Sequence, residues 1–569
     1  MGKYIWKLAD IPEKEIQELM KSLSCSRPLA LFFAARGINH SSAEQFFKPP
    51  LQGLGDPYII PGMEESAKRL WDAVMSREKI LIHGDYDTDG VTAAALLHWV
   101  LSENGADVSC FLPDRIEDGY GFTVESLKKA LAENNYKLIV TVDCGMSSID
   151  TVAFAQSKGV DVIVTDHHEP KAAIPKAFSV INPKLYSSLL DLHVLAGVGI
   201  SFKLCHAFIK YGRENHSLND TFDLNDGLDL VALGTVADIV PLTGENRILV
   251  CNGLKVLSRQ VRPGIRALCE IAGINAEIKA SDITFCLAPR LNAAGRLGNA
   301  KVAFDLLRTG NIIEAYRYAE QLEGFNHKRQ AKEEEIISAV SAQIKEKVDL
   351  AGNFSIIVAG SDWHQGVIGI VASRLAKEHH RPSLVFSING DLALGSGRSV
   401  DNINILDVLL ECSDLLERYG GHPMAAGMCI KTDRLKEFNV RFEAAVQKIT
   451  NKTHAAPQLS IDGEVEMREL NGEFFSLLEK LEPFGHCNSQ PLFRINGLQP
   501  FKIQSAAANH CRGYLKDSRE NIIPFIAFNR KMNSLPLEPL WDIVASPQMN
   551  KFRGESNPQL QILDLCQSE

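Results

Sequence analysis

Three acidic turns constrain the fold of this chain more than any other feature, because each follows a short run of apolar, mostly β-branched residues. The runs end just before Asp85, Asp143 and Asp166, and helical patterns follow the first two turns. Short β-type runs that alternate with amphipathic helical patterns predict a parallel sheet with helices on both faces. Ligands bind at the carboxyl edge of such a sheet, so the fold itself would bring the three turns together.

The three turns are rich in acids and imidazoles. These residues are His83, Asp85, Asp87, Asp89, Asp143, Asp166, His167 and His168. Carboxylates crowded this closely repel each other, so the cluster is stable only where cations neutralise it. Mixed carboxylate and imidazole ligands suit Mn²⁺ or Mg²⁺, and a shared carboxylate can hold two ions roughly 3.5–4 Å apart. The turns therefore predict a site for a pair of divalent ions.

A fourth segment, residues 228–242, is an apolar run that carries Asp238. Its pattern fits either a helix or a strand, and its acid could complete the same site. A single acid beside an apolar element is most often a helix N-cap. Four such acids in one expected place favour a hydrolytic site, in which paired ions generate hydroxide and clamp a phosphoryl group.

The length of 569 residues is enough for about four compact units. We predict an N-terminal helical appendage over residues 1–60 and a catalytic α/β domain over 61–310. Residues 311–348 mix apolar residues at helical spacing with alternating charges, which predicts a long connecting helix. A second α/β domain is expected over 349–452, and short β-type runs over 458–569 predict a small β-barrel.

Composition limits the class of protein. With 45% hydrophobic and 23% charged residues, the chain is neither collagen nor a coiled coil nor wholly disordered. It shows no signal peptide or membrane-spanning run, and its 12 Cys lack CxxC pairs, so we expect a cytoplasmic protein with reduced thiols and no membrane contact. The net charge of −10 argues against indiscriminate coating of nucleic acid, but nucleic acid could still be the substrate.

The C-terminal region differs from the rest in charge. Residues 494–553 contain nine Lys or Arg against four Asp or Glu, and aromatic residues from Phe493 to Phe552 are interleaved with them. Basic grooves with aromatic platforms are how OB-folds hold single strands without reading their sequence. Any single aromatic is more often part of a barrel core, so the prediction of an OB-like single-strand-binding domain concerns the domain rather than a residue.

The order and spacing of these motifs resemble the DHH phosphoesterase superfamily. The matching motifs are HGDYDTDG at 83–90, VDCG at 142–145, TDHHEP at 165–170 and LGTVADIVPL at 233–242. GSGRS at 395–399 and YGGHPMAAG at 419–427 resemble the companion DHHA1 domain of that superfamily. The length, the segment APRLNAAGRLGNA at 288–300 and the C-terminal β domain are most similar to its bacterial single-strand-specific exonucleases. The resemblance covers roughly residues 60 to 569.

The resemblance implies roles for individual residues. One ion would be held by His83, Asp87 and Asp143, and the other by Asp89, Asp143, His167 and Asp238. Asp143 would then bridge the ions, while Asp85 and Asp166 would orient ligands through hydrogen bonds. His168 would donate to the scissile phosphate and act in catalysis with Asp143 and Asp89; a purely structural histidine is the alternative.

Substrate binding should depend on side chains that hold phosphate, and the planar fork of Arg is well suited to this. The candidates are Arg115, Arg290, Arg296, Arg374, Ser396, Arg398 and His422. Each arginine alone is about as often part of a surface ion pair. In the superfamily the DHHA1 domain closes over the active site, which implies a substrate path between the two α/β domains.

The resemblance implies a metal-dependent enzyme that degrades single-stranded DNA in the 5′→3′ direction to nucleoside 5′-monophosphates, in DNA repair and recombination. It also implies work alongside a single-strand-binding protein and a helicase, and we expect a monomer. One alternative is a different DHH phosphoesterase, acting on oligoribonucleotides or cyclic dinucleotides, which the length disfavours. The other is an inactive single-strand binder, which would have no need to hold so much buried negative charge.

Overall fold

The computed structural model describes residues 4–115, 118–119, 121–216, 222–275, 277–451, 453, 456–506, 509–536, 539–552 and 555–568. The chain forms two compact units. The first unit contains residues 6–323 and 460–569, and the second contains residues 324–459 with Tyr4 and Ile5. Glu538 and Arg553, which belong to the predicted basic region, lie outside the described residues.

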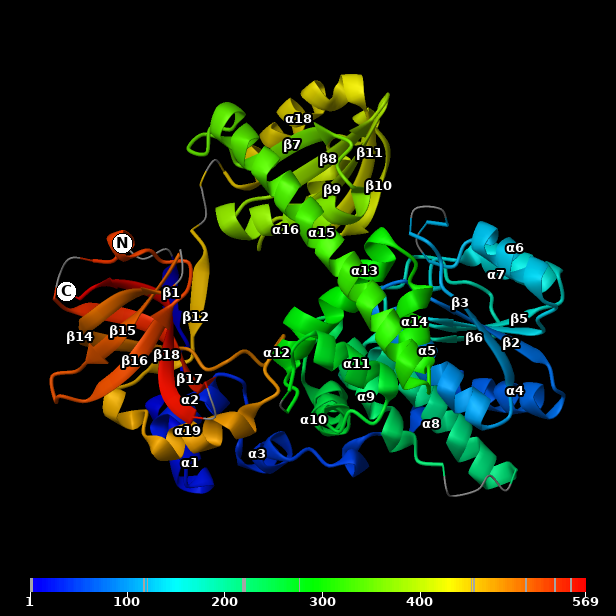
Figure 1. Ribbon diagram of the computed structural model, residues 1–569, viewed down its shortest axis with the longest axis horizontal. Helices are drawn as coiled ribbons and strands as arrows, with labels where there is room; N and C mark the ends of the chain where they lie inside the picture. Colours follow the sequence, from blue (N-terminus) through cyan, green and yellow to red (C-terminus); the bar gives the residue numbers. More distant parts are fainter. Residues whose placement is uncertain are drawn as a thin grey trace. The chain divides into compact units, whose positions relative to one another are not determined.

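A five-stranded parallel sheet forms the centre of the α/β part of the first unit (Figure 1). In spatial order its strands are β3 (Asp107–Phe111), β2 (Lys79–Gly84), β4 (Leu138–Val142), β5 (Asp161–Thr165) and β6 (Ser179–Ile181). The side chains of β4 are all buried, and those of β2 and β5 nearly all. Continuous apolar burial is typical of strands that helices cover on both faces.

Helices cover both faces of this sheet (Figure 1). Helices α6 (Val124–Glu133) and α7 (Ile149–Ser157) share a core with Leu81, Ile139 and Val162 on one face. The other helices of this part include α4 (Met63–Met75), α5 (Thr88–Glu103), α8 (Gly197–Asn215), α9 (Leu228–Ala237) and α10 (Gly244–Ser258). The first ten residues of the segment 228–242 thus form a helix rather than a strand, and Asp238 is the residue that caps its C-terminal end.

Each predicted acidic turn begins where a strand ends. Strand β2 ends at Gly84, directly before Asp85, and β4 and β5 end directly before Asp143 and Asp166. Because the strands are parallel, all three turns lie at the carboxyl edge of the sheet.

The C-terminal part of the first unit is a closed five-stranded barrel. Its strands are β14 (Phe493–Ala506), β15 (His510–Lys516), β16 (Ile522–Ala527), β18 (Glu555–Gln567) and β17 (Trp541–Phe552), in that order, and β17 pairs with β14 to close it. Phe493, Phe525 and Trp541 are buried in its core, whereas Tyr514 and Phe528 are exposed. The predicted OB-like barrel is therefore confirmed.

The N-terminal helices pack against this barrel. They are α1 (Glu13–Leu23), α2 (Arg27–Ala34) and α3 (His40–Phe47). Leu29, Phe32 and Phe33 belong to the same buried core as Phe493 and Trp541. Residues 1–60 were predicted to be a helical appendage; they contain these helices and also a short strand, β1 (Ile5–Leu8). The helices share their core with residues more than 400 positions away along the chain.

A long helix leads from the first unit into the second. Helix α15 (Ile312–Lys347) contains 36 residues, in agreement with the predicted connecting helix. The second unit has a mixed sheet with the order β10 (Leu416–His422), β11 (Ala425–Lys431), β9 (Leu392–Arg398), β8 (Ser383–Asn389) and β7 (Ile356–Ser361). Helices α16 (Gln365–His379) and α18 (Leu435–Ile449) complete this second α/β domain.

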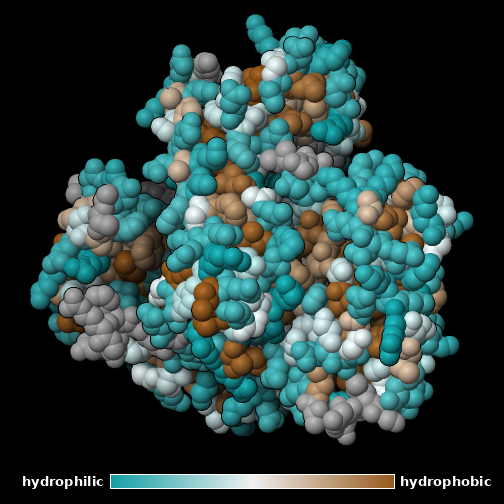
Figure 2. Space-filling model, turned by 45° about the vertical axis from the view of Figure 1, so that its right-hand side comes forward, coloured by the Kyte–Doolittle hydropathy of each residue, from teal (hydrophilic) through white to brown (hydrophobic). Residues whose placement is uncertain are grey.

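Among the described residues, no helix combines the length and apolar character needed to cross a membrane. The face shown in Figure 2 is mostly hydrophilic, with apolar residues scattered over it.

Candidate metal centre

Carboxylates and imidazoles converge at the carboxyl edge of the parallel sheet. Within the described part of the chain they form three groups, in each of which the potential ligand atoms lie within 4.8 Å of one another. The groups are Asp89 with His167 and Asp238, Asp85 with Asp87 and Asp143, and Asp143 with His167 and His168. Asp143 and His167 each belong to two groups, so the three groups form one continuous cluster.

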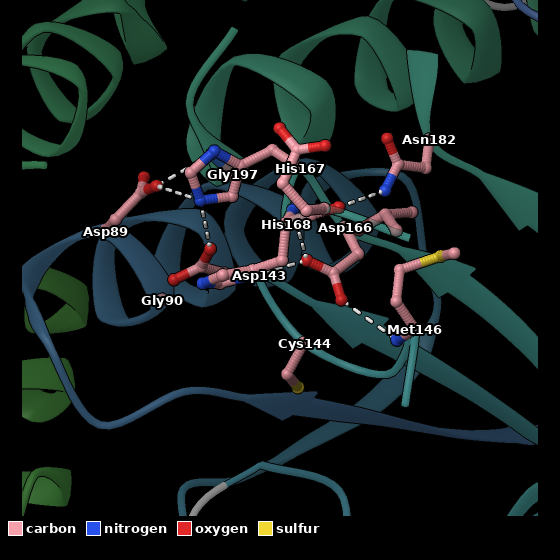
Figure 3. Close-up of polar contacts among 12 residues, drawn as sticks. Asp89, Gly90, Asp143, Cys144, Met146, Asp166, His167, His168, Asn182 and Gly197 are labelled. Carbon is pink, nitrogen blue, oxygen red and sulfur yellow. Dashed lines mark hydrogen bonds and ion pairs between the residues drawn. The ribbon is translucent and has the colours of Figure 1, made fainter. Parts of the chain in front are cut away.

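His167 lies at the centre of the cluster. Its Nε2 atom is 3.2 Å from Asp143 Oδ1 and 4.0 Å from Asp89 Oδ2 (Figure 3). The same nitrogen is 3.6 Å from Asp238 Oδ2. Burial lowers the pKa of His167 to about 3, so the imidazole is neutral near pH 7 and can offer a lone pair to a metal.

The carboxylates around His167 are held in an environment that disfavours their charge. Burial and the neighbouring Asp89 raise the pKa of Asp143 well above its ordinary value. Burial and nearby acids also raise the pKa of Asp89 to about 7, of Asp85 to about 8 and of Asp238 to about 9. Asp143 Oδ1 is buried and has no hydrogen-bond partner among the described residues. A divalent cation would neutralise the acids and supply that partner, so these residues fit such an ion.

The N-terminus of α8 holds Asp89 by hydrogen bonds and lies directly against Asp143, a feature that the sequence did not predict. Both carboxylate oxygens of Asp89 accept hydrogen bonds from this helix, one from Gly197 N at 2.7 Å and one from Val198 N at 2.8 Å. A Cβ atom on Gly197 would lie 2.5 Å from Asp143 Oδ1, so only glycine allows this close approach. Asp143 itself has a φ of 60°, a left-handed conformation that is uncommon outside glycine. The available signal was the pair Gly197 and Gly199 at the start of an apolar helical run.

His168 is oriented by Asp166. Its Nδ1 atom is 2.7 Å from Asp166 Oδ1, and Met146 N donates to the other carboxylate oxygen at 2.9 Å (Figure 3). Burial lowers the pKa of His168, but the hydrogen bond to Asp166 and the surrounding carboxylates outweigh this effect and raise it to about 9. His168 is therefore a charged donor near pH 7, and Asp166 holds it. Asp166 was predicted to orient metal ligands, but its hydrogen bond is to the predicted phosphate donor.

His83 lies outside all three groups, although the resemblance implied that it is a ligand. Its Nε2 atom is 3.1 Å from Ser126 Oγ, and its ring packs against Phe111 and Phe122. Side chains alternate along a strand, so His83 shares with Leu81 the sheet face that α6 and α7 cover. Asp85, which follows the end of the strand, lies in one group with Asp87 and Asp143, the two acids predicted to share an ion with His83.

The candidate phosphate-binding residues of the first unit differ in their availability. Arg115 is exposed, with its guanidinium 5.3 Å from the centre of the Tyr86 ring. Arg296 is partly buried near the end of α13 (Ala288–Leu297). Arg290, by contrast, forms an ion pair with Glu323 at 2.6 Å and donates to Cys286 O. Arg290 is thus bound by other residues of the protein, and its predicted role in phosphate binding would require these contacts to break.

The remaining candidates lie in the second unit. Arg398 Nη1 donates to Ser396 Oγ at 3.1 Å, so these two residues of β9 form one polar group. Arg374 is exposed on α16, 4.0 Å from Glu333, and His422 is exposed at the end of β10.

These features define the class of protein: a DHH-type phosphoesterase with a companion α/β domain and a barrel. The DHH family, N-terminal domain, matches residues 79–235, the DHHA1 domain matches 352–448 and the RecJ OB domain matches 461–564. The single-stranded-DNA-specific exonuclease RecJ of Bacillus subtilis is 32% identical over 100% of this chain and 71% of its own length. This chain therefore belongs to the RecJ family.

Solved structures agree with this assignment. The crystal structure of RecJ from Thermus thermophilus in complex with Mn²⁺ has a TM-score of 0.85 and 30% identity, and the comparison covers 100% of this chain and 80% of that one. The corresponding complex with Mg²⁺ has a TM-score of 0.79 and 29% identity, with coverage of 100% and 79%.

Proposed function

We propose that this protein is a single-stranded-DNA-specific exonuclease that depends on divalent metal ions. The observation that carries the proposal is the cluster of buried carboxylates around a neutral His167 in a RecJ-family chain. The Bacillus relative is named for this activity, and the Thermus structures contain Mn²⁺ or Mg²⁺. Degradation in the 5′→3′ direction to nucleoside 5′-monophosphates is the finer part of the proposal.

We assign two ion positions to the cluster. Asp89, Asp143, His167 and Asp238 would hold one ion, and Asp85, Asp87 and Asp143 would hold the other. Asp143 bridges the positions, as the resemblance implied, but Asp85 replaces His83 as a ligand. When bound, such a pair of ions lowers the pKa of water and stabilises charge on a phosphoryl group.

The other residues of the site would bind and orient the strand. His168, charged and held by Asp166, donates to the phosphate oxygens where negative charge develops. Arg115 and Arg296 in the first unit are proposed to contact phosphates, and the barrel is proposed to hold the strand. Arg374, Ser396, Arg398 and His422 are proposed to do the same in the second unit. Work with a helicase and a single-strand-binding protein is proposed from the resemblance. A cytoplasmic location is proposed from the sequence, which shows no signal peptide and no CxxC pairs, and a monomeric state is proposed with it.

Two other functions compete with this proposal. A DHH phosphoesterase for oligoribonucleotides or cyclic dinucleotides would use the same acids, but the match to the RecJ OB domain over 461–564 favours the exonuclease. An inactive binder would not need the buried acid cluster, because unneutralised buried charge is costly.

Labelled oligonucleotides test the proposal directly. With Mn²⁺ or Mg²⁺, we expect mononucleotides to be released at once from a 5′-labelled single strand, while a 3′-labelled strand shortens gradually and a blunt duplex stays intact. EDTA should stop the reaction, since the acid cluster needs cations to act. Cleavage of short oligoribonucleotides alone would move the protein to the other phosphoesterases, and binding without cleavage would leave the inactive binder.

The role of His168 can be tested separately. We expect His168→Gln to lower kcat by about 10²-fold, because one charged donor to the developing negative charge is lost. Mn²⁺ affinity, measured by isothermal titration calorimetry, should stay the same because His168 is not assigned to either ion. If the variant keeps its full rate, or if it loses Mn²⁺ binding, His168 does not have this role.

A further inference from the structure

Helix α13 (Ala288–Leu297) packs against residues 85–89, here called the acid loop, which runs from the end of β2 into the first turn of α5. Asn292 Oδ1 accepts two hydrogen bonds from Thr88, one from its backbone N at 2.8 Å and one from its Oγ1 at 3.0 Å. Thr88 is the residue between Asp87 and Asp89. The segment 288–300 was singled out in the sequence for its arginines, but an asparagine makes these hydrogen bonds to the residue between the two acids.

Helix α13 also contacts Tyr86, the residue on the other side of Asp87. A Cβ atom on Gly295 would lie 2.4 Å from the carbonyl oxygen of Tyr86, so α13 lies directly against the backbone there. Asn292 and Gly295 thus contact the residues immediately before and after Asp87. Helix α13 is itself anchored, because the ion pair between Arg290 and Glu323 joins it to α15.

The position of Thr88 matters to both proposed ions. Asp87 belongs to the group with Asp85 and Asp143, whereas Asp89 belongs to the group with His167 and Asp238. Thr88 joins these two acids covalently, so a shift of its backbone would move one ligand of each ion. Thr88 N is also an N–H of the first turn of α5, and such groups need an acceptor from outside the helix.

We infer that Asn292 is a positioning residue for the metal centre: it fixes Thr88 so that Asp87 and Asp89 point at their separate ions. This inference rests on the proposed function, because it assigns those acids to metal binding. Groups outside the coordination sphere that hold metal ligands in place commonly change metal affinity by ~10–100-fold when they are mutated. Asn292 would act in this way, because its hydrogen bonds are to Thr88 and not to the acids themselves.

The test compares Asn292→Ala with Asn299→Ala in the full-length protein. Asn299 is a matched control, because its side chain also accepts a backbone hydrogen bond, from Lys301 N at 2.8 Å, but outside the acid loop. For Asn292→Ala we expect Mn²⁺ binding, measured by isothermal titration calorimetry, to weaken by ~10-fold or more. The kcat on a single-stranded oligonucleotide should fall and recover partly with excess Mn²⁺, while KM stays the same. Asn299→Ala should match the parent.

A second variant keeps the inference testable if Asn292→Ala fails to fold. Thr88→Val removes only the hydroxyl half of the contact and should weaken Mn²⁺ binding by a smaller factor, ~3-fold. The inference is overturned if both foldable variants bind Mn²⁺ like the parent, or if Asn299→Ala loses as much affinity. If the parent itself neither binds Mn²⁺ nor degrades single strands, the proposed function has failed instead.

Discussion

Asp143→Asn is expected to abolish strand degradation and, in the metal-free protein, to raise thermal stability. The activity should fall by more than ~10³-fold, beyond the effect of losing one stabilising donor, because Asp143 serves both proposed ions. The stability should rise because the substitution removes a buried carboxylate that Asp89 and the burial itself make costly. Removing buried charge is often neutral or stabilising, and here the crowded acids favour a rise in Tm.

The two expected effects of Asp143→Asn have opposite signs, so a variant that is merely misfolded cannot produce both of them. Differential scanning calorimetry with EDTA measures the stability, and release of mononucleotides with Mn²⁺ measures the activity. Asp150→Asn makes the same change of charge at an exposed position on α7 and should leave both unchanged. A lower Tm for Asp143→Asn would mean that its carboxylate stabilises the metal-free fold, and substantial remaining activity would mean that it does not bridge the ions.

The sequence predicted the parts of the site that depend on local order along the chain. Acids that follow β-type runs identified Asp85, Asp143 and Asp166 as neighbours, because parallel strands end at one edge. The same reasoning could not decide whether residues 228–242 form a helix or a strand, since a buried apolar run has no clear period. Packing against α5 and α10 makes the segment a helix.

What the sequence could not predict depends on contacts between distant residues. His83 resembles a ligand by its motif, yet its ring turns to the face covered by α6 because strand side chains alternate. The N-terminal helices contain ordinary amphipathic patterns, and nothing in them indicates that Phe32 packs in a core with Phe493. Gly197 lies against Asp143 because it has no side chain, and the pair Gly197 and Gly199 was its only signal in the sequence. Asn292 accepts hydrogen bonds from Thr88, between two of the acids, and an asparagine within a helix gives no sign of such a distant contact.

Gly197→Ala is expected to disrupt the metal centre although the residue carries no functional group. The added Cβ would lie 2.5 Å from Asp143 Oδ1 and 2.7 Å from Asp143 Cβ, well inside van der Waals contact. Either Asp143 or the start of α8 must move, and α8 also holds both oxygens of Asp89. We expect Mn²⁺ binding to weaken by ~10–100-fold and kcat to fall with it, and the free energy of unfolding to drop by about 1–3 kcal/mol from overpacking.

Gly199→Ala, two residues along the same helix, provides the matched control. Its Cβ would meet the side chain of Leu195 at 3.3 Å, a contact that a small shift of a flexible side chain relieves. Calorimetric titration with Mn²⁺ and thermal unfolding should therefore separate the two variants. If Gly197→Ala binds Mn²⁺ as tightly as Gly199→Ala does, the close approach of α8 to Asp143 is not needed for metal binding. Metal binding would then depend on the acids themselves and on the contacts of α13 with residues 86–88.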